Sequence, residues 1–181
     1  MTTTFKYSLE GQETDRLIFR KIQESDFDIW LEFCKFQDSL KYIFSQKELE
    51  IEDPIERCKI WFDRVFHRYK NNLGGMNAMI DKKTGEFVGQ CGLLIQTVDE
   101  IEELEIGYSL MPNFRGQGYA IESAKKCKYF AFEKNFSNSL ISIIHINNQA
   151  SAKVAIANGM TLEKTTISKG DAVNIFRVNK N

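Results

Sequence analysis

The sequence predicts one domain, residues 1–181, of the α+β (mixed α/β) class, with a mixed, mostly antiparallel central sheet flanked by about four helices. Two observations carry this prediction. Hydrophobic residues make up 43% of the chain and only two prolines occur, which favours a folded domain with a sizeable core. The spacing of apolar residues also changes repeatedly between the periods of strands and helices, in the order β-α-α-β-β-β-α-β-α-β-β. No internal repeat or linker interrupts this order.

The first third of the chain predicts one strand and two helices. Residues 15–22 alternate apolar and basic side chains, as a strand does. Ser25 is the expected cap of the helix that follows. After a polar segment, residues 37–52, Asp53 and Pro54 predict the start of a second helix, because proline at the first helical position loses no needed donor.

The middle of the chain predicts an antiparallel meander of three strands. They are "MNAMID" (76–81), "EFVGQCGLLIQTV" (86–98) and "ELEIGYSL" (103–110). "DKKTG" has the composition of a hairpin turn between the first two. Pro112 ends the third strand, since proline lacks the donor that a ladder needs.

The C-terminal third predicts two helices and three strands. A helix runs from Gly118 to about residue 134, and the β-branched run 139–146 is typical of a strand covered on both faces. The next helix, 148–159, closes with Asn-Gly, which tolerates a left-handed cap. A hairpin over residues 160–178 completes the chain.

Charge and composition exclude several classes of function. The formal net charge of −1 leaves no electrostatic footprint for nucleic acid. No apolar run approaches the roughly 20 residues that span a bilayer, and the start of the sequence does not resemble a secretory signal, so we expect a cytoplasmic protein. No CxxC motif occurs, so we expect neither a metal site nor disulfides; the cysteines are Cys34, Cys58, Cys91 and Cys127.

The stretch "NFRGQGYAIE", residues 113–122, suggests an anion-binding turn at the start of a helix. A helix start exposes unpaired N–H groups and the positive end of the helix dipole. Gly116 and Gly118 let the backbone approach a ligand closely and take positive φ. Arg115 adds a charge suited to phosphate. The stretch therefore predicts a phosphate or pyrophosphate cradle, the alternative being a solvated glycine turn.

Three phosphate motifs compete for this stretch. The Walker loop requires GxxxxGK[ST], which does not occur. The dinucleotide fingerprint GxGxxG fails at its third glycine, where Ile121 stands. The acetyl-coenzyme A motif Q/R-x-x-G-x-G/A fits when it is read as Arg115-x-x-Gly118-x-Ala120.

Four segments together resemble the GCN5-related N-acetyltransferases (GNAT). They are "LEIGYSLMPNFRGQGYAIESAKKCKYFAFEK", "NNQASAKVAIANGM", "TDRLIFRKIQESDFD" and "DKKTGEFVGQCGL". The last two are similar to the branch of the family that acetylates ribosomal-protein N-termini, the RimJ/RimL type. The resemblance covers residues 14 to 178. It implies a GNAT-type domain that binds acetyl-CoA where two neighbouring parallel strands, 103–110 and 139–145, splay apart.

The resemblance also implies which residues hold the cofactor. Pyrophosphate is expected on backbone N–H groups, and the pantetheine arm on main chain near Leu110 and Met111. Asn148 and Ser151 match polar residues near the thioester, although each is also suited to capping a helix. The residues expected at the pyrophosphate are Arg115, Gly116, Gln117, Gly118, Tyr119 and Ala120.

The chemistry of acetyl transfer requires a neutral amine. An α-amino group has a pKa of about 7.7–8.0, whereas a lysine-like amine at about 10.4 needs roughly 4 kcal/mol more help at pH 7. Glu105 matches the position of the family's general base, and strand alternation turns it away from the core-facing Leu104 and Ile106. The alternative is a solvated charge in the acidic run 98–105, a run that is also suited to attracting a cationic acceptor. Ala155 stands where some members carry a tyrosine acid, which leaves Ser151, a water or an unprotonated thiolate.

The sequence therefore predicts an acetyl-CoA-dependent N-acetyltransferase that acts on a primary amine, in the first place a protein N-terminal α-amine. Two alternatives remain open: a small-molecule acceptor (polyamine, amino acid or aminoglycoside), or a non-catalytic acyl-CoA-binding module. We expect residues 37–52 to border the acceptor site. No metal, nucleic acid or membrane is implied, and both a monomer and a homodimer are compatible with the sequence.

Overall fold

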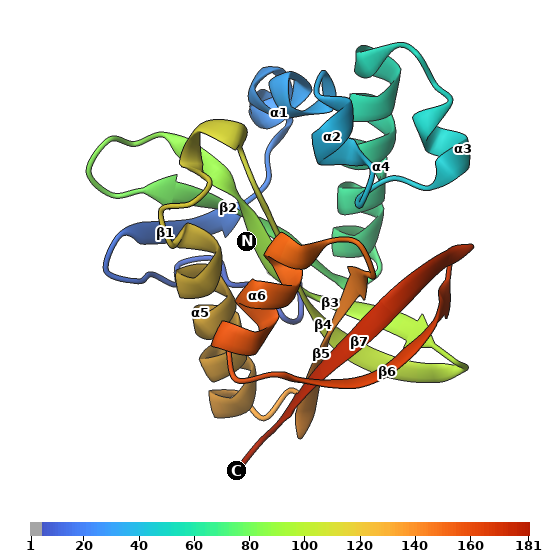
Figure 1. The fold of residues 1–181 in the computed structure, drawn as a ribbon. Coiled ribbons are helices and arrows are strands. Elements are labelled where there is room, and N and C mark those ends of the chain that lie inside the picture. Colours follow the sequence, from blue (N-terminus) through green and yellow to red (C-terminus); the bar gives the residue numbers. More distant parts are fainter. Residues whose placement is uncertain (1–4) are drawn as a thin grey trace.

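A computed structural model describes residues 5–181, so residues 1–4 of the predicted domain lie outside the described part. Its strands form one seven-stranded sheet in the order β1-β2-β3-β4-β5-β7-β6 (Figure 1). Every neighbouring pair is antiparallel except β4 and β5, which are parallel. The predicted mixed, mostly antiparallel sheet is confirmed. The strands are β1 Leu17–Lys21, β2 Gly74–Asp81, β3 Phe87–Val98, β4 Ile101–Leu110, β5 Ser139–His145, β6 Thr161–Ser168 and β7 Asp171–Asn179.

The four predicted helices are present within residues 5–181: α1 Phe27–Cys34, α4 Pro54–Lys70, α5 Tyr119–Glu133 and α6 Gln149–Ala157. Two one-turn helices, α2 Gln37–Leu40 and α3 Gln46–Leu49, occupy the segment that the sequence marked only as polar. Ser45 and Glu48 account for α3, because they form a reciprocal capping box. Short 3-10 turns precede α1 (η1 Glu24–Asp26) and follow β4 (η2 Pro112–Phe114). None of the helices in residues 5–181 has both the length and the apolar character to cross a membrane.

The two predicted helix starts fared differently. Asp53 caps α4 by accepting from the Ile55 N–H at 2.9 Å, as expected. The predicted cap at Ser25 is wrong, since Ser25 lies inside η1. The carboxylate of Asp26 takes that place: it accepts from the Gln23 N–H at 2.8 Å and pairs with Arg20 at 2.7 Å. A charged acceptor that is also ion-paired outcompetes the serine hydroxyl.

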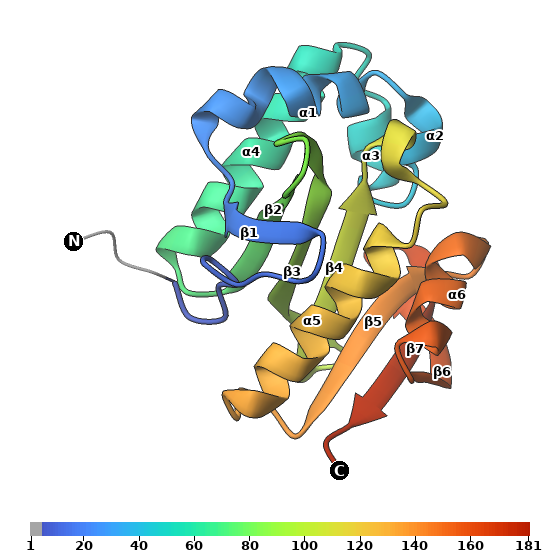
Figure 2. The same cartoon turned by 90° about the vertical axis from the view of Figure 1, so that its left-hand side faces the viewer.

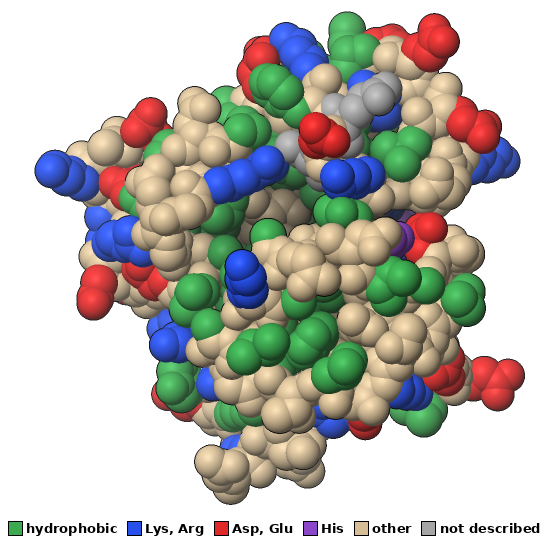
Figure 3. All heavy atoms as spheres, in the orientation of Figure 1, with side chains coloured by type: hydrophobic (Ala, Val, Ile, Leu, Met, Phe, Trp, Pro, Cys, Tyr) green, Lys and Arg blue, Asp and Glu red, His purple; other side chains and the backbone are tan. Residues whose placement is uncertain are grey.

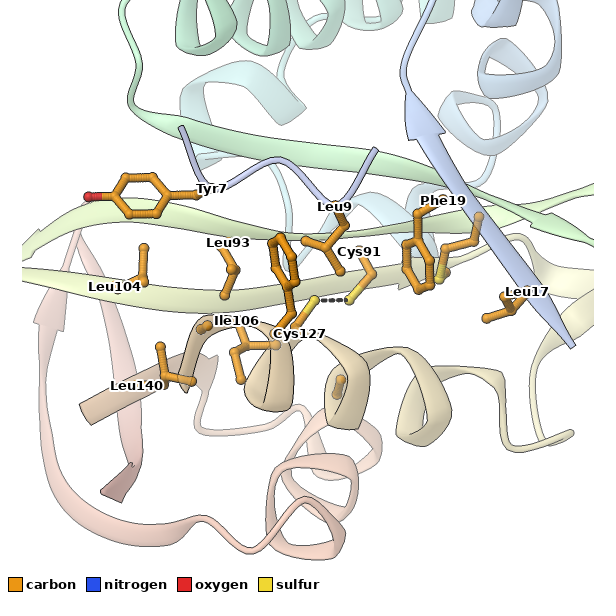
Figure 4. Close-up of a cluster of buried hydrophobic side chains, with 14 of the residues drawn as sticks. Tyr7, Leu9, Leu17, Phe19, Cys91, Leu93, Leu104, Ile106, Cys127 and Leu140 are labelled. Carbon is orange, nitrogen blue, oxygen red and sulfur yellow. Dashed lines mark hydrogen bonds between the residues drawn. The ribbon is translucent and has the colours of Figure 1, made fainter. Parts of the chain in front are cut away.

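Helices cover both faces of the sheet. Figure 2 shows α5 along one face and α4 on the other side. The core beneath α5 joins Leu93, Ile106 and Leu140 of the sheet to Cys127 of the helix (Figure 4). The Sγ atom of Cys127 lies 3.3 Å from that of Cys91. A second core packs α1 and α4, through their aromatic side chains, against β2 and the start of β3. The sheet is thus held rigidly up to the junction of β4 and β5.

The junction of β4 and β5 opens the sheet. These strands pair only at Glu105 and Ile141, whereas β3 and β4 pair along the whole of β4. One residue further on, the Ser142 hydroxyl donates to the Ile106 carbonyl at 2.9 Å. Beyond that bond the two strands diverge. The expected pair of splayed parallel strands is therefore present.

Candidate active site

A cavity of about 1090 Å³ begins at the splay between β4 and β5. Its walls come from the glycine turn before α5, from α6, from β3 to β5, from the β6–β7 turn, and from α4 with the segment that precedes it. In Figure 3 the surface is hollowed between the helices α1 and α2 and the helix α6. One continuous space thus connects the glycine turn to Glu105.

The glycine turn has the geometry of an anion cradle. Gly116 and Gly118 take φ of +73° and +85°, and Gly118 is the N-cap of α5. Among residues 5–181, none accepts a hydrogen bond from the backbone N–H groups of residues 116–120. A Cβ on Gly116 would meet nothing within 4 Å, so its backbone conformation rather than lack of room calls for glycine. These donors at a helix start fit a pyrophosphate.

The cradle is braced from outside the cavity by Arg16 of the first strand region. Its Nη1 donates to the Gln117 carbonyl at 2.9 Å, and its Nε pairs with Glu122 at 2.6 Å. The guanidinium also lies 4.1 Å from the ring centre of Tyr119. The Tyr119 hydroxyl in turn donates to Asp81 at 2.7 Å. Sequence reasoning missed Arg16, because it is a hundred residues from the turn that it holds.

The residues expected at the pyrophosphate therefore divide into two groups. Arg115, Gly116, Gly118 and Ala120 line the cavity. The side chains of Gln117 and Tyr119 do not line it, and Tyr119 is buried against Arg16 and Asp81. For these two residues only the backbone N–H remains available to a ligand.

The expected pantetheine residues also differ from each other. Leu110 lines the cavity, and its carbonyl accepts from the Nε of Arg115 at 3.3 Å. Met111 lies outside the lining and packs against the α1–α4 core. Its N–H donates to Val88 and its carbonyl accepts from Phe114, both at 3.0 Å. In this structure both main-chain groups of Met111 are thus engaged within the protein.

Glu105 lies on β4 at the last residue before the strands part, and it lines the cavity. Leu104, Ile106 and Tyr108 face the opposite way, into the core under α5, as alternation predicts. Burial raises the pKa of Glu105. The hydrogen bond from Gln96, the charge of Lys169, the Ile143 N–H and the charge of Arg68 oppose that rise. A carboxylate with a raised pKa is a stronger base, which suits proton abstraction near neutral pH.

The acidic run before Glu105 is partly neutralised by the C-terminal strands. Glu103 pairs with Arg177 of β7 at 2.6 Å, and Asp99 pairs with Lys164 of β6 at 2.7 Å. The predicted attraction of a cationic acceptor by this run is therefore reduced at both residues. Glu105, which is turned toward the cavity, is the member of the run that lies at the β4–β5 junction.

Asn148 and Ser151 both line the cavity at the start of α6. Asn148 is the cap of this helix, since its Oδ1 accepts from the Ser151 N–H at 3.1 Å. The Ser151 hydroxyl makes no hydrogen bond to the described part of the chain, while its carbonyl accepts from the Tyr108 hydroxyl at 2.8 Å. Burial raises the pKa of Tyr108, so this residue keeps its proton and docks α6 onto β4. The cap assigns Asn148 a structural role and leaves the Ser151 hydroxyl available.

The segment 37–52 forms one wall of the cavity, as expected. The Tyr42 hydroxyl donates to the Asn147 carbonyl at 3.3 Å, and its ring centre lies 5.2 Å from that of His145. These contacts join the segment to the turn between β5 and α6. The lining residues of the segment are Asp38, Lys41, Tyr42, Ile43, Phe44 and Ser45.

Comparison with known proteins agrees with this geometry. The family model described as an acetyltransferase (GNAT) domain matches residues 16–161. The protein YkkB of Bacillus subtilis (strain 168) is 39% identical over 85 residues, a match that spans 47% of this chain and 49% of YkkB. The uncharacterized N-acetyltransferase p20 of Bacillus licheniformis is 23% identical over 175 residues, 93% of this chain and 94% of p20.

Solved structures share the fold. An acetyltransferase from Agrobacterium tumefaciens str. C58 has a TM-score of 0.75 at 23% identity, with 99% of this chain and 100% of that one covered. RimL, a ribosomal L7/L12 alpha-N-protein acetyltransferase in complex with coenzyme A, has a TM-score of 0.72 at 20% identity, with 92% and 95% covered. Spermidine N-acetyltransferase from Vibrio cholerae, in complex with CoA and spermine, has a TM-score of 0.67 at 12% identity, with 92% and 96% covered. At these identities the likeness establishes the fold.

Proposed function

This chain belongs to the RimJ/RimL-like GNAT acetyltransferases, and we propose that it transfers the acetyl group of acetyl-CoA to the α-amine of a protein N-terminus. GNAT acetyltransferases use acetyl-CoA, and coenzyme A is bound in the related RimL structure. One observation carries the proposal: a carboxylate with a raised pKa, Glu105, lies in the same cavity as an anion cradle at a helix start.

The residues present fit acetyl-CoA. The unpaired N–H groups of residues 116–120 and the nearby Arg115 suit a pyrophosphate. The gap beyond the single β4–β5 pair leads from this cradle to Glu105 and to the start of α6. Acetyl-CoA supplies the thioester carbonyl that an amine attacks.

Glu105 acts as the general base in this proposal. Its carboxylate takes a proton from the acceptor amine, directly or through one water, and so makes the nitrogen lone pair available. At the other end of the reaction the Ser151 hydroxyl, which has no partner in residues 5–181, is placed to donate to the departing sulfur. Tyr108 takes no part in proton transfer, since its raised pKa and its bond to the Ser151 carbonyl hold its proton.

The charges near Glu105 favour a singly charged acceptor over a polyamine. The cations whose charge reaches Glu105 are Lys169 and Arg68, and a polyamine would bring further positive charge beside them. The acids Asp99 and Glu103, which would otherwise balance it, are paired with basic residues of β6 and β7. An α-amine also has a pKa low enough for one carboxylate to deprotonate it.

An acceptor screen with acetyl-CoA, read by release of free thiol, tests the proposal. Each peptide in the screen is paired with the same peptide carrying a blocked N-terminus and an internal lysine. We expect turnover with the free peptide and none with the blocked one. Turnover with spermidine, an amino acid or an aminoglycoside but with no peptide would replace the proposed acceptor by a small molecule. Binding of acetyl-CoA without turnover of any amine would indicate a non-catalytic acyl-CoA-binding module.

A further inference from the structure

A chain of hydrogen bonds leads from α4 to Glu105. The Nη2 of Arg68 donates to the Oε1 of Gln96 at 3.2 Å, and the Nε2 of Gln96 donates to the Oε2 of Glu105 at 2.7 Å. Gln96 is on β3 and Glu105 is on β4. All three side chains line the cavity. The shorter of the two bonds ends on the carboxylate.

The register of the sheet explains how Gln96 reaches Glu105. Gln96 pairs with Glu103 and Leu94 pairs with Glu105, so Gln96 and Glu105 are diagonal neighbours on the same face. Glu103 turns to Arg177 at 2.6 Å and does not compete for the glutamine amide. The pairing therefore leaves the amide of Gln96 directed along the strand toward Glu105.

Arg68 determines which end of the Gln96 amide faces Glu105. A guanidinium can only donate, so the glutamine must present its oxygen to Arg68 and its NH₂ group to the carboxylate. The opposite orientation would place two donors together on one side and two acceptors together on the other. Arg68 itself is held in place, because its Nη1 donates to the carbonyls of Leu73 and Ile95, both at 3.0 Å.

We propose that Gln96 is a positioning residue that holds the Glu105 carboxylate toward the cavity, and that Arg68 fixes the direction in which Gln96 acts. The proposal rests on the proposed role of Glu105 as the base. Gln96 occupies one carboxylate oxygen and leaves the other for the acceptor amine or a water. A base held in one orientation reacts from that orientation in every encounter.

The charged and polar groups around Glu105 come from every neighbouring element. Arg68 lies on α4, Lys169 in the β6–β7 turn and the Ile143 N–H on β5, and each lowers the pKa of Glu105 against the effect of burial. Tyr108 on β4 also senses the Glu105 charge, which raises the pKa of the tyrosine. Removing the donor of Gln96 therefore raises the pKa of Glu105 further. The ionised base is then lost at a higher pH than in the wild type.

Two substitutions of Gln96 test the proposal. Gln96→Leu removes the donor, and we expect kcat/KM at about pH 6.5 to fall by about 10- to 100-fold, the loss expected for a hydrogen bond to a charged group. The loss should shrink as the pH rises. Gln96→Glu keeps the shape and the bond to Arg68 but sets a second carboxylate beside Glu105, so the acid limb of the profile should move further in the same direction. Gln46→Leu, an exposed glutamine on α3 outside the cavity lining, is the matched control and should keep the wild-type profile.

A titration without acetyl-CoA separates this proposal from the proposed function. The Glu105 carboxyl is followed by ¹³C NMR in the wild type, in Gln96→Leu and in the control. A higher Glu105 pKa in Gln96→Leu supports the positioning role, and coincident titrations overturn it. Full turnover by Glu105→Gln would instead overturn the role of Glu105 as base, and the titration would still report on Gln96.

The role of Arg68 is tested by a double-mutant cycle. If Arg68 acts through Gln96, Arg68→Met should raise the Glu105 pKa less in the Gln96→Leu background than in the wild type. Equal effects in the two backgrounds would overturn this part of the proposal. Melting temperatures are measured in parallel, since Arg68→Met also removes the bonds to Leu73 and Ile95.

Discussion

The two ends of the cavity are built in different ways. The cradle at residues 115–120 offers backbone N–H groups from one short stretch, with a single brace from Arg16. The surroundings of Glu105 are made by side chains and backbone of α4, β3, β5 and the β6–β7 turn. The comparison teaches that a phosphate site made of backbone donors is written locally in the sequence. A base with an adjusted pKa needs neighbours that only folding brings together.

Loss of the base should give the largest effect. Glu105→Gln is expected to lower kcat by about 10²- to 10⁴-fold, the range for general bases, and to leave acetyl-CoA affinity near normal. Because burial raises the pKa of Glu105, wild-type activity should fall as the pH drops through that raised value. The loss in the variant should shrink at high pH, where the amine deprotonates itself. Rates across pH 6 to 9 (about the range around an α-amine pKa) and calorimetric affinities check this. The control is Glu102→Gln, an exposed carboxylate of the same strand. Wild-type turnover by Glu105→Gln over the whole range would remove Glu105 from the mechanism.

Damage to the cradle should affect binding instead of chemistry. Gly118→Val forces a β-branched residue to φ of +85°, with its Cβ 3.4 Å from Arg16, so the turn must rearrange. We expect acetyl-CoA to bind about 100-fold more weakly, while the far-UV circular dichroism stays close to wild type. Gly85→Val in the β2–β3 turn, where φ is +74° and no atom lies within 4 Å, carries the same backbone strain away from the cavity. If Gly118→Val bound acetyl-CoA normally, the glycines would serve only to turn the chain.

Ser151 lies between the two ends and should affect only the rate. The cap of α6 is Asn148, and the Ser151 hydroxyl has no partner in residues 5–181. Ser151→Ala is therefore expected to slow turnover by about 10- to 100-fold without a change in melting temperature. Asn148→Ala is the matched comparison and should cost about 1 kcal/mol of stability. An unchanged rate in Ser151→Ala would leave protonation of the thiolate to a water or to no group at all.

The smallest effect should come from Arg115. Arg115→Ala removes one charge from the cavity wall and leaves the backbone donors in place. We expect acetyl-CoA affinity to fall by less than about tenfold and its dependence on salt to flatten, because only a screened charge contact is lost. Lys83→Ala, which removes an exposed charge in the β2–β3 turn, should change neither quantity. A loss as large as that of Gly118→Val would show that side-chain charge, and not the backbone, carries the binding.

Much of the fold and part of the site could be predicted, for identifiable reasons. The long helices and all seven strands have clear apolar periods, and the Asp53-Pro54 start of α4 is a local signal. The cap at Ser25 was wrong because Asp26 is held there by Arg20, which is outside the local pattern. The helices α2 and α3 were missed because each is a single turn, too short to show a period.

By itself the sequence determined the order of the elements, the anion cradle, the face of β4 that carries Glu105 and the presence of Ser151 near the cavity. These depend on residues adjacent in the chain or separated by one strand or helix period. Only the tertiary structure decided that Arg16 braces the cradle, that Asn148 is committed to a cap, and that Arg68 and Gln96 hold the Glu105 carboxylate. These contacts join residues far apart in the sequence, and each depends on the sheet register or on how a helix packs, which no local pattern encodes.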